Sequence, residues 1–200
     1  IDRVFDVFSG TSLTLQNVTV SGGQTVGGND GGGVRSLGTL AVADSTLTGN
    51  STDANGGAIY TAATGVASTL SGNITATDAA LTVSNAAAYP AQPGFLILVG
   101  NEQMRVEAIN GAAFSVTRAV NGSTATVHSA GATVSVVDMS LINLTVVTNN
   151  ADFGAGVFND GGTVVLTGSS VTSNVAVTDG GGVYNDRTAT LNVLGSTLVS

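Results

Sequence analysis

Short segments in which apolar and polar residues alternate recur along the chain, and each ends in a residue suited to a turn. The two apolar positions and the turn residue of each segment are Leu13, Leu15 and Asn17; Leu40, Val42 and Asp44; Met139, Leu141 and Asn143; Val164, Leu166 and Gly168; and Leu191, Val193 and Gly195. A further short apolar segment follows each turn, centred on Val20, Leu47, Val146, Val171 and Leu198. A period of two predicts β-strands that direct alternate side chains into a core and outward.

Clusters of small residues followed by a β-branched residue form a second recurring landmark. They lie at Gly31–Val34, Gly56–Ile59, Gly154–Val157 and Gly180–Val183. The distance from Val34 to Ile59 is 25 residues, and that from Val157 to Val183 is 26. Short strands repeated at this period predict an all-β fold, a right-handed parallel β-helix of about five rungs. Each rung is expected to hold three short strands.

The repeat is interrupted once, in its third rung. Ile59 and Val157 are 98 residues apart, where the period predicts about 26. We therefore assign residues 1–66 and 138–200 to the β-helix and residues 67–137 to an inserted small β domain. Alternation in the insert predicts five antiparallel strands of a barrel or sandwich, at Leu81–Val83, Phe95–Val99, Gln103–Ile109, Ala113–Thr117 and Thr133–Val137. The Asn110-Gly111 pair predicts a tight turn between two of them.

The composition excludes several classes of function. The formal charge is −8, the isoelectric point is near 4.1 and lysine is absent, so the chain lacks the basic patch that nucleic acids require. No apolar run approaches the length of a membrane span. Without cysteine, disulfides and thiolate metal sites are impossible. Abundant Thr, Ser, Asn and Gly suit an extracellular or cell-surface protein.

Four segments share a Gly-rich cluster, a β-branched residue and, in the longer three, a following alternating strand: Asp30–Asn50, Gly56–Tyr60, Gly154–Asn174 and Gly180–Ser200. This pattern resembles the parallel β-helix repeats of large bacterial surface proteins, including polymorphic outer-membrane proteins and autotransporter-like adhesins. The resemblance implies a scaffolding role. The insert resembles a small β module found in phage tail and bacterial surface proteins.

Three acidic residues are candidates for binding calcium, the one cofactor that the sequence suggests. Asp30, Asp152 and Asp179 lie just before Gly clusters, with Asn55 at the equivalent position of another rung. Rung stacking would bring such groups into one column, and Ca²⁺ takes six to eight oxygen ligands. The alternative is that they bond the backbone of tight turns, as Asp and Asn commonly do.

A pair of carboxylates is a candidate for cleaving glycosidic bonds. Asp160 and Asp186 occupy equivalent rung positions, and Arg187 follows directly. Glycoside hydrolases place two carboxyl groups about 5–10 Å apart. Exposed turn residues explain the same pattern, so we expect no catalytic residue and keep a polysaccharide-active enzyme as the alternative. His128 has no second His or Cys to join it and is expected to be structural or exposed.

An aromatic column is a candidate ligand-binding surface. Phe8, Tyr60, Phe158 and Tyr184 each follow an inward β-branched residue, and Arg35 occupies the same slot. Alternation predicts that these side chains face outward on one side of the rod. Exposed aromatics would bind a sugar or a protein partner. The alternative is that they cover the rod beneath a loop or the insert.

Five Asn-x-Ser/Thr sequons are possible glycosylation sites. They lie at Asn17, Asn50, Asn73, Asn121 and Asn143. The repeat itself generates several of them, so their number is not a separate indication of modification.

The rung pattern continues to Val199 without the polar cap that keeps solenoids soluble. Uncapped rungs expose strand edges that pair with further strands. We therefore expect a non-enzymatic extracellular structural or adhesive protein that stacks head to tail with itself into a fibre, or forms part of a longer surface β-helix. The alternatives are a polysaccharide-active or carbohydrate-binding β-helix, with cell-surface glycans as partners, and a phage tail-associated fibre.

Overall fold

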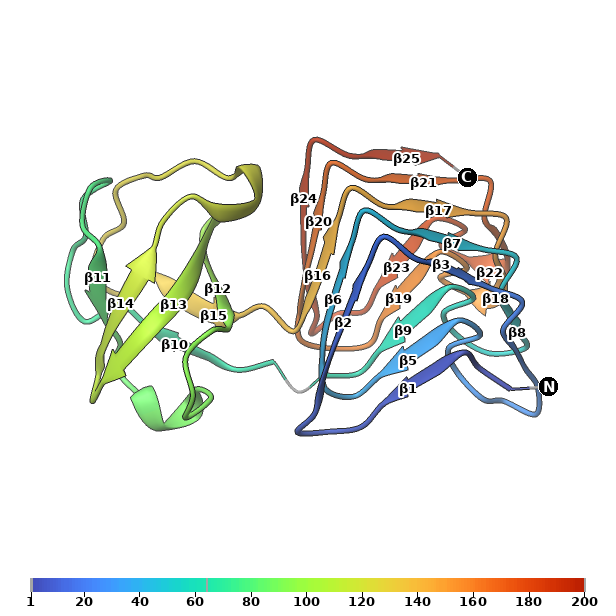
Figure 1. Cartoon of the computed structure of the whole chain (residues 1–200), viewed down its shortest axis with the longest axis horizontal. Coiled ribbons are helices and arrows are strands. Elements are labelled where there is room, and N and C mark those ends of the chain that lie inside the picture. The colour runs from blue at the N-terminus through green and yellow to red at the C-terminus, as the bar shows by residue number, and fades with distance from the viewer. Residues whose placement is uncertain (1, 64, 200) are drawn as a thin grey trace. The chain divides into compact units, whose positions relative to one another are not determined.

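The computed structural model describes residues 2–63 and 65–199. This part of the chain is all-β apart from two single 3₁₀ turns, η1 (Ala86–Ala88) and η2 (Val120–Gly122). Neither is long and apolar enough to cross a membrane. The chain divides into two compact units, one formed by Ile1–Thr64 with Asp138–Ser200 and the other by Gly65–Val137 (Figure 1).

The first unit is a parallel β-solenoid in which successive strands of a rung belong to four sheets. The first sheet holds β1 (Phe5–Val7), β5 (Val34–Ser36), β9 (Ile59–Thr61), β19 (Val157–Asn159) and β23 (Val183–Asn185). The second holds β2 (Ser12–Gln16), β6 (Thr39–Ala43), β16 (Met139–Ile142), β20 (Thr163–Thr167) and β24 (Thr190–Leu194). The third holds β3 (Thr19–Ser21), β7 (Thr46–Thr48), β17 (Thr145–Val147), β21 (Ser170–Thr172) and β25 (Thr197–Val199). The parallel β-helix prediction is confirmed.

A fourth sheet corrects the expectation of three strands per rung. It holds β4 (Gln24–Thr25), β8 (Ser51–Thr52), β18 (Asn150–Phe153) and β22 (Val175–Asp179). Strands as short as β4 and β8 have two polar residues each and no alternation that could be detected in the sequence. They form because parallel pairing between rungs continues past the third sheet, as in the contact of Gln24 with Ser51.

The core of the solenoid consists of the apolar columns that alternation predicts. In the second sheet, Met139 pairs in register with Leu40 and Val164, so that residues from distant parts of the sequence stack directly. Figure 1 shows β16 beside β6, although the whole second unit lies between these two strands in the sequence. These side chains are fully buried, and each stabilises the fold by about 1.5–3 kcal/mol through removal of apolar surface from water.

A column of buried asparagines runs along the turns between the third and fourth sheets. Asn50, Asn149 and Asn174 are at most 3% exposed. Asn149 Oδ1 accepts hydrogen bonds from Asn50 N (3.0 Å) and Nδ2 (3.1 Å), and Asn149 N and Nδ2 donate to Asn174 Oδ1 (3.1 and 2.8 Å). Each side-chain amide also donates to a backbone carbonyl one rung away. This asparagine ladder satisfies turn groups that have no partner within the strands.

The second unit is a closed antiparallel β-barrel. Its strands follow the order β10 (Ala67–Thr69), β15 (Thr133–Val136), β12 (Leu96–Val99), β13 (Glu102–Asn110), β14 (Ala113–Thr117) and β11 (Ala80–Thr82). A bridge between Leu70 and Val83 joins the two edges. The barrel has its own core, with Met104 and Phe114 fully buried.

The barrel contains the five expected strands and one that the sequence does not reveal. The additional strand, β10, contains only Ala, Ser and Thr, so it shows no apolar alternation. The turn after β13 is tight as predicted, but Gly111 and Ala112 are its central residues, and Asn110 is the last residue of the strand. Gly111 takes a φ of +60°, which Gly adopts without a steric penalty.

Asp138 is a buried carboxylate just before β16. It is 9% exposed, and its Oδ2 accepts a hydrogen bond from Thr163 N at 2.8 Å. Burial raises the pKa of Asp138, and the bond from Thr163 opposes this rise only in part. Because the pKa of Asp138 is higher in the folded than in the unfolded state, its contribution to the stability of the folded state is present at low pH. This contribution is lost as the pH rises through the folded-state pKa.

We predict that Asp138→Asn raises the melting temperature at neutral pH, because the amide keeps an acceptor oxygen for Thr163 without a buried charge. Thermal unfolding followed by circular dichroism checks this. Asp179→Asn, at an exposed carboxylate, is the control and should change little. A melting temperature for Asp138→Asn at or below that of the parent protein would contradict the prediction.

Candidate functional site

The outward face of the first sheet carries a stacked aromatic column. Tyr60, Phe158 and Tyr184 lie in register on β9, β19 and β23. The ring centroids of Tyr60 and Phe158 are 5.7 Å apart at an interplanar angle of 22°, and those of Phe158 and Tyr184 are 4.8 Å apart at 8°. Tyr60 and Phe158 are each 7% exposed, so the expectation that they form an exposed surface is wrong. The rings of Tyr60 and Phe158 are thus buried within the stack, whereas Tyr184, at the end of the column, is half-buried.

Phe8 does not belong to this column. The register pairs Phe5 with Val34 and Asp6 with Arg35, so Asp6 occupies the slot and Phe8 lies outside it, 63% exposed. Phe5 and Val34 are 29 residues apart, which is longer than the period of the other rungs. Because this rung is longer, Phe5 aligns with Val34, whereas the regular period predicts that Val7 would do so. Arg35 lies next to Tyr60 as expected, and its Nη1 is 3.1 Å from Asp6 Oδ1.

Tyr60 connects the column to one of the candidate carboxylates. Its Oη donates a hydrogen bond to Asp160 Oδ2 at 2.7 Å. Burial raises the pKa of Tyr60, and the bond to Asp160 raises it further, so the phenol stays protonated. The phenol therefore acts as a hydrogen-bond donor that fixes the turn after β19.

We predict that Tyr60→Phe destabilises the solenoid by about 0.5–1.5 kcal/mol, because it removes one hydrogen bond and keeps the ring stack. Urea unfolding measures the loss. In an Asp160→Ala background the same substitution should cost less, since the partner is already absent. An equal cost in both backgrounds would show that the bond contributes nothing.

The two candidate carboxylates have different surroundings. Asp160 accepts the bond from Tyr60, whereas Asp186 donates its backbone N–H to Asn159 O at 2.9 Å. Arg187 is exposed, and it takes part in none of the ion pairs found in residues 2–63 and 65–199. The register pairs Asn159 with Asn185, so Asp160 and Asp186 follow equivalent positions of adjacent rungs, as expected, and a catalytic role for the pair stays an untested alternative.

The three calcium candidates are not brought together. Asp30 Oδ1 accepts bonds from Asn55 N (3.1 Å) and Nδ2 (2.8 Å), which is the turn-bonding role. In the next rung Phe153, rather than Asp152, aligns with Asn55, and Phe153 in turn pairs with Asp179. A register shift in β18 displaces Asp152 from this column. Within the described residues, no three His, Cys, Asp or Glu side chains are placed to hold a metal ion.

The barrel contains a buried ionic network, centred on Glu102, that was not predicted from the sequence. The side chain of Glu102 is 0% exposed. Arg118 binds it with two contacts, Nε to Oε1 at 2.6 Å and Nη2 to Oε2 at 2.7 Å, and His128 Nε2 lies 2.8 Å from Oε2. Glu102 shares strand parity with buried Met104 and Val106, so alternation could have indicated a charged residue directed inward.

This network also fixes backbone segments of the barrel. Arg118 Nη1 donates to Thr75 O (2.7 Å) and Asp78 O (3.1 Å), and its Nη2 donates to Thr126 O (2.8 Å). Burial alone would raise the pKa of Glu102, but hydrogen bonds from Arg118 and His128 outweigh burial and lower it to about 2. Glu102 is therefore a carboxylate at physiological pH and serves as the anchor of the network.

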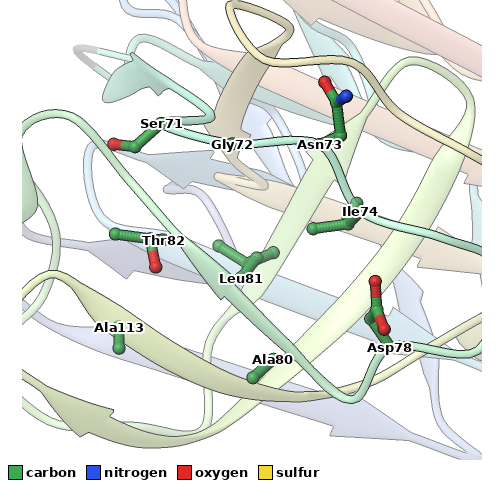
Figure 2. A pocket seen from close by; sticks show the side chains of 9 residues that line it. All are labelled: Ser71, Gly72, Asn73, Ile74, Asp78, Ala80, Leu81, Thr82 and Ala113. Atoms are coloured by element: carbon green, nitrogen blue, oxygen red, sulfur yellow. The ribbon is translucent and has the colours of Figure 1, made fainter.

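A pocket of about 360 Å³ opens beside this network, on the wall of the barrel (Figure 2). It is lined by Ser71, Gly72, Asn73, Ile74, Asp78, Ala80, Leu81, Thr82 and Ala113. Figure 2 shows segment 71–74 on one side and β11 on the other, connected by the turn that holds Asp78. Ile74 and Leu81 are nearly buried, whereas hydroxyl, amide and carboxylate groups lie around them. Thr75 N donates to Asp78 Oδ2 at 2.7 Å, which fixes the turn.

The sequons differ in accessibility. Asn50 is wrong as a glycosylation candidate, because its side chain is buried in the asparagine ladder. Asn17 and Asn143 lie at exposed corners with φ near +50°. Asn73 is exposed, but its Oδ1 accepts a bond from the backbone, and Asn121 Nδ2 donates to a buried glutamine. Modification of these four remains a prediction.

Comparisons with known proteins identify no family for this chain. No protein-family model matches, and no curated protein matches. Among solved structures, the tailspike of Acinetobacter baumannii bacteriophage AP22, in complex with a capsular saccharide, aligns at 10% identity and a TM-score of 0.31 over 94% of this chain and 42% of that one. The tailspike protein of Pseudomonas phage LKA1 aligns at 13% identity and a TM-score of 0.32 over 94% of this chain and 37% of that one. The chain thus spans less than half the length of each, and a likeness this distant indicates no function.

Proposed function

We propose that the chain is a non-enzymatic structural segment of an extracellular β-helix protein of the surface or adhesive type, which carries the barrel. The asparagine ladder is the observation that supports this most directly. Its amides are used entirely in bonds within and between rungs, as are the stacked rings of Tyr60 and Phe158. These polar and aromatic side chains therefore stabilise the stacking of the rungs.

The carboxylates of the solenoid support the same proposal. Each of three carboxylates accepts a hydrogen bond from another residue of the solenoid: Asp160 from Tyr60, Asp30 from Asn55, and Asp138 from Thr163. A glycosidase needs two carboxyl groups facing one sugar site. We expect no release of sugar fragments when the protein is incubated with neutral and acidic polysaccharides. Cleavage that disappears in Asp160→Asn would contradict a non-enzymatic role.

End-to-end association is the second part of the proposal. The sheets end in β1, β2, β3 and β4 on one side and in β22, β23, β24 and β25 on the other. Exposed apolar side chains lie on these outer rungs, namely Val4, Phe8, Val18, Val26, Val175, Val177, Val193, Leu198 and Val199. Edge strands pair readily with further strands, and a contact of this kind that does not close into a ring yields a filament. A further rung, from a second copy or an adjoining segment, fits these edges.

Negative-stain electron microscopy at rising protein concentrations tests the association. We expect fibres that lengthen with concentration. Leu198→Asp, on the core side of β25, should abolish them, whereas Thr197→Asp on the opposite face of the same strand should not. Particles of one short length at every concentration would refute self-assembly.

The pocket of the barrel supports a second candidate function, binding of a glycan. Its volume and its mixture of an apolar floor with a few polar groups are typical of small-molecule sites. Ala113→Trp should fill it and remove binding on a glycan array, and Ala108→Trp, at an exposed position of β13 outside the lining, is the control. Absence of binding by the parent protein, or equal binding by both variants, would reject this function.

A further inference from the structure

The sequence contains three Asn-Gly pairs, and the structure places them in different environments. They are Asn55-Gly56, Asn110-Gly111 and Asn121-Gly122. Gly has no Cβ, so its backbone nitrogen approaches the side chain of a preceding Asn with little hindrance. All three pairs therefore share the same local chemistry, and any difference in their reactivity must come from the fold.

Two of the pairs are held by hydrogen bonds. Asn55 Nδ2 donates to Asp30 Oδ1 at 2.8 Å, and Gly56 N donates to a carbonyl of the adjacent rung at 2.9 Å. Asn121 Nδ2 donates to Gln103 Oε1 at 2.9 Å, and Gln103 is 0% exposed. Attack of the Gly nitrogen on the Asn side chain requires these bonds to break first.

Asn110 has no such restraint. It ends β13 at the tip of a hairpin, and both Asn110 and Gly111 are exposed. A Cβ built on Gly111 would meet no atom within 4 Å, so the space around the turn is open. Among the hydrogen bonds of the described residues, none holds the Asn110 side chain or Gly111 N. The backbone pair of Asn110 with Ala113 is the last of the hairpin, where opening is least costly.

We propose that Asn110 is a site of spontaneous deamidation that forms isoaspartate. Gly111 N loses its proton to solvent base and attacks Cγ of Asn110, which forms a C–N bond and closes a succinimide ring. The side-chain amide group takes up a proton and leaves as ammonia. Water then adds to one of the two ring carbonyls and opens the ring to aspartate or isoaspartate, with no change in oxidation state.

The reaction changes the charge and the backbone at the hairpin tip. One negative charge is added to the formal −8 of the chain. Isoaspartate also inserts a methylene group into the main chain, which disrupts the terminal pair of Asn110 with Ala113. The next pair, Ile109 with Phe114, contains a fully buried ring and keeps the rest of the hairpin in register.

Peptide mapping by mass spectrometry, after incubation at mildly alkaline pH in heavy-oxygen water, tests the proposal. We expect the Asn110 peptide to gain label as both acid isomers roughly tenfold faster than the Asn55 and Asn121 peptides. In urea-unfolded protein the three rates should converge, because the fold no longer protects two of the sites. Equal rates in the folded protein, or an intact Asn110, would overturn the proposal.

A variant provides an independent measurement. In Asn110→Gln the longer side chain closes its ring far less readily, so acidic forms should stop accumulating on isoelectric focusing. The substitution lies at an exposed position and leaves the barrel core unchanged. Undiminished accumulation of acidic forms in this variant would place the reaction elsewhere and refute the assignment.

Discussion

Replacement of Asn149 with alanine will destabilise the solenoid by roughly 3–5 kcal/mol. Asn149 is 1% exposed and is the middle member of the asparagine ladder. Its loss leaves the backbone N and the Nδ2 of Asn50 without their shared acceptor, and it removes the side-chain donor to Asn174 Oδ1, which keeps only the backbone donor of residue 149. Buried polar groups without partners are costly because water cannot replace the lost bonds. Urea unfolding monitored by circular dichroism measures the change.

The neighbouring residue offers a matched control. Asn150 is of the same type and is exposed at the start of β18, and no side-chain bond is found for it among the described residues. Asn150→Ala should leave the urea midpoint nearly unchanged. A loss of equal size in both variants would show that the cost arises from replacing Asn in this turn rather than from the ladder.

Arg118→Met will destabilise the barrel by about 3–5 kcal/mol, because it leaves the carboxylate of Glu102 buried without its main partner. The substitution also removes the donor to the carbonyls of Thr75, Asp78 and Thr126. Tyr89 is the one tyrosine of residues 65–137, so its NMR signals report on this unit separately. Unfolding followed through Tyr89 should shift to lower urea.

Two further variants separate charge pairing from general effects of losing an arginine. Arg105 pairs with Glu107 at 3.0 Å, but their side chains are 57% and 40% exposed, so Arg105→Met should change stability little. Replacing Glu102 together with Arg118 by Met should recover part of the loss, since no charge remains buried alone. No recovery in the double variant would contradict the proposed origin of the instability.

The same network predicts acid sensitivity of the barrel. The pKa of Glu102 is lowered from 4.5 to about 2. A carboxyl group with a depressed folded-state pKa contributes stability that is present above its unfolded value and is lost as the pH falls toward the folded value. Barrel stability should therefore decline between about pH 4.5 and pH 2, as seen through Tyr89. In Glu102→Gln this decline should be smaller.

The sequence by itself determined the rung architecture and much of the barrel. Leu40, Met139 and Val164 alternate with outward residues in the same way, and parallel stacking buries them all in one column. Alternation is a local property, because side chains on a strand switch faces at every residue. For that reason the core strands could be predicted, whereas β4, β8 and β10, which are short and polar, could not.

Which residues share a column was decided by the tertiary structure. Phe8 and Asp152 fail to align because one rung is longer and β18 shifts its register, and neither effect changes the local pattern. The turn length and the backbone bonds between rungs set the alignment, and a shift of one residue moves a side chain to the opposite face.

Long-range partners likewise exist only in the folded chain. Asn50 meets Asn149 across 99 residues of sequence, and Glu102 meets Arg118 and His128 from separate segments of the barrel. Alternation could place Glu102 on the inward face but could not name its partners. Their choice depends on barrel closure and rung stacking, which bring the groups within hydrogen-bonding distance only when the backbone has already paired.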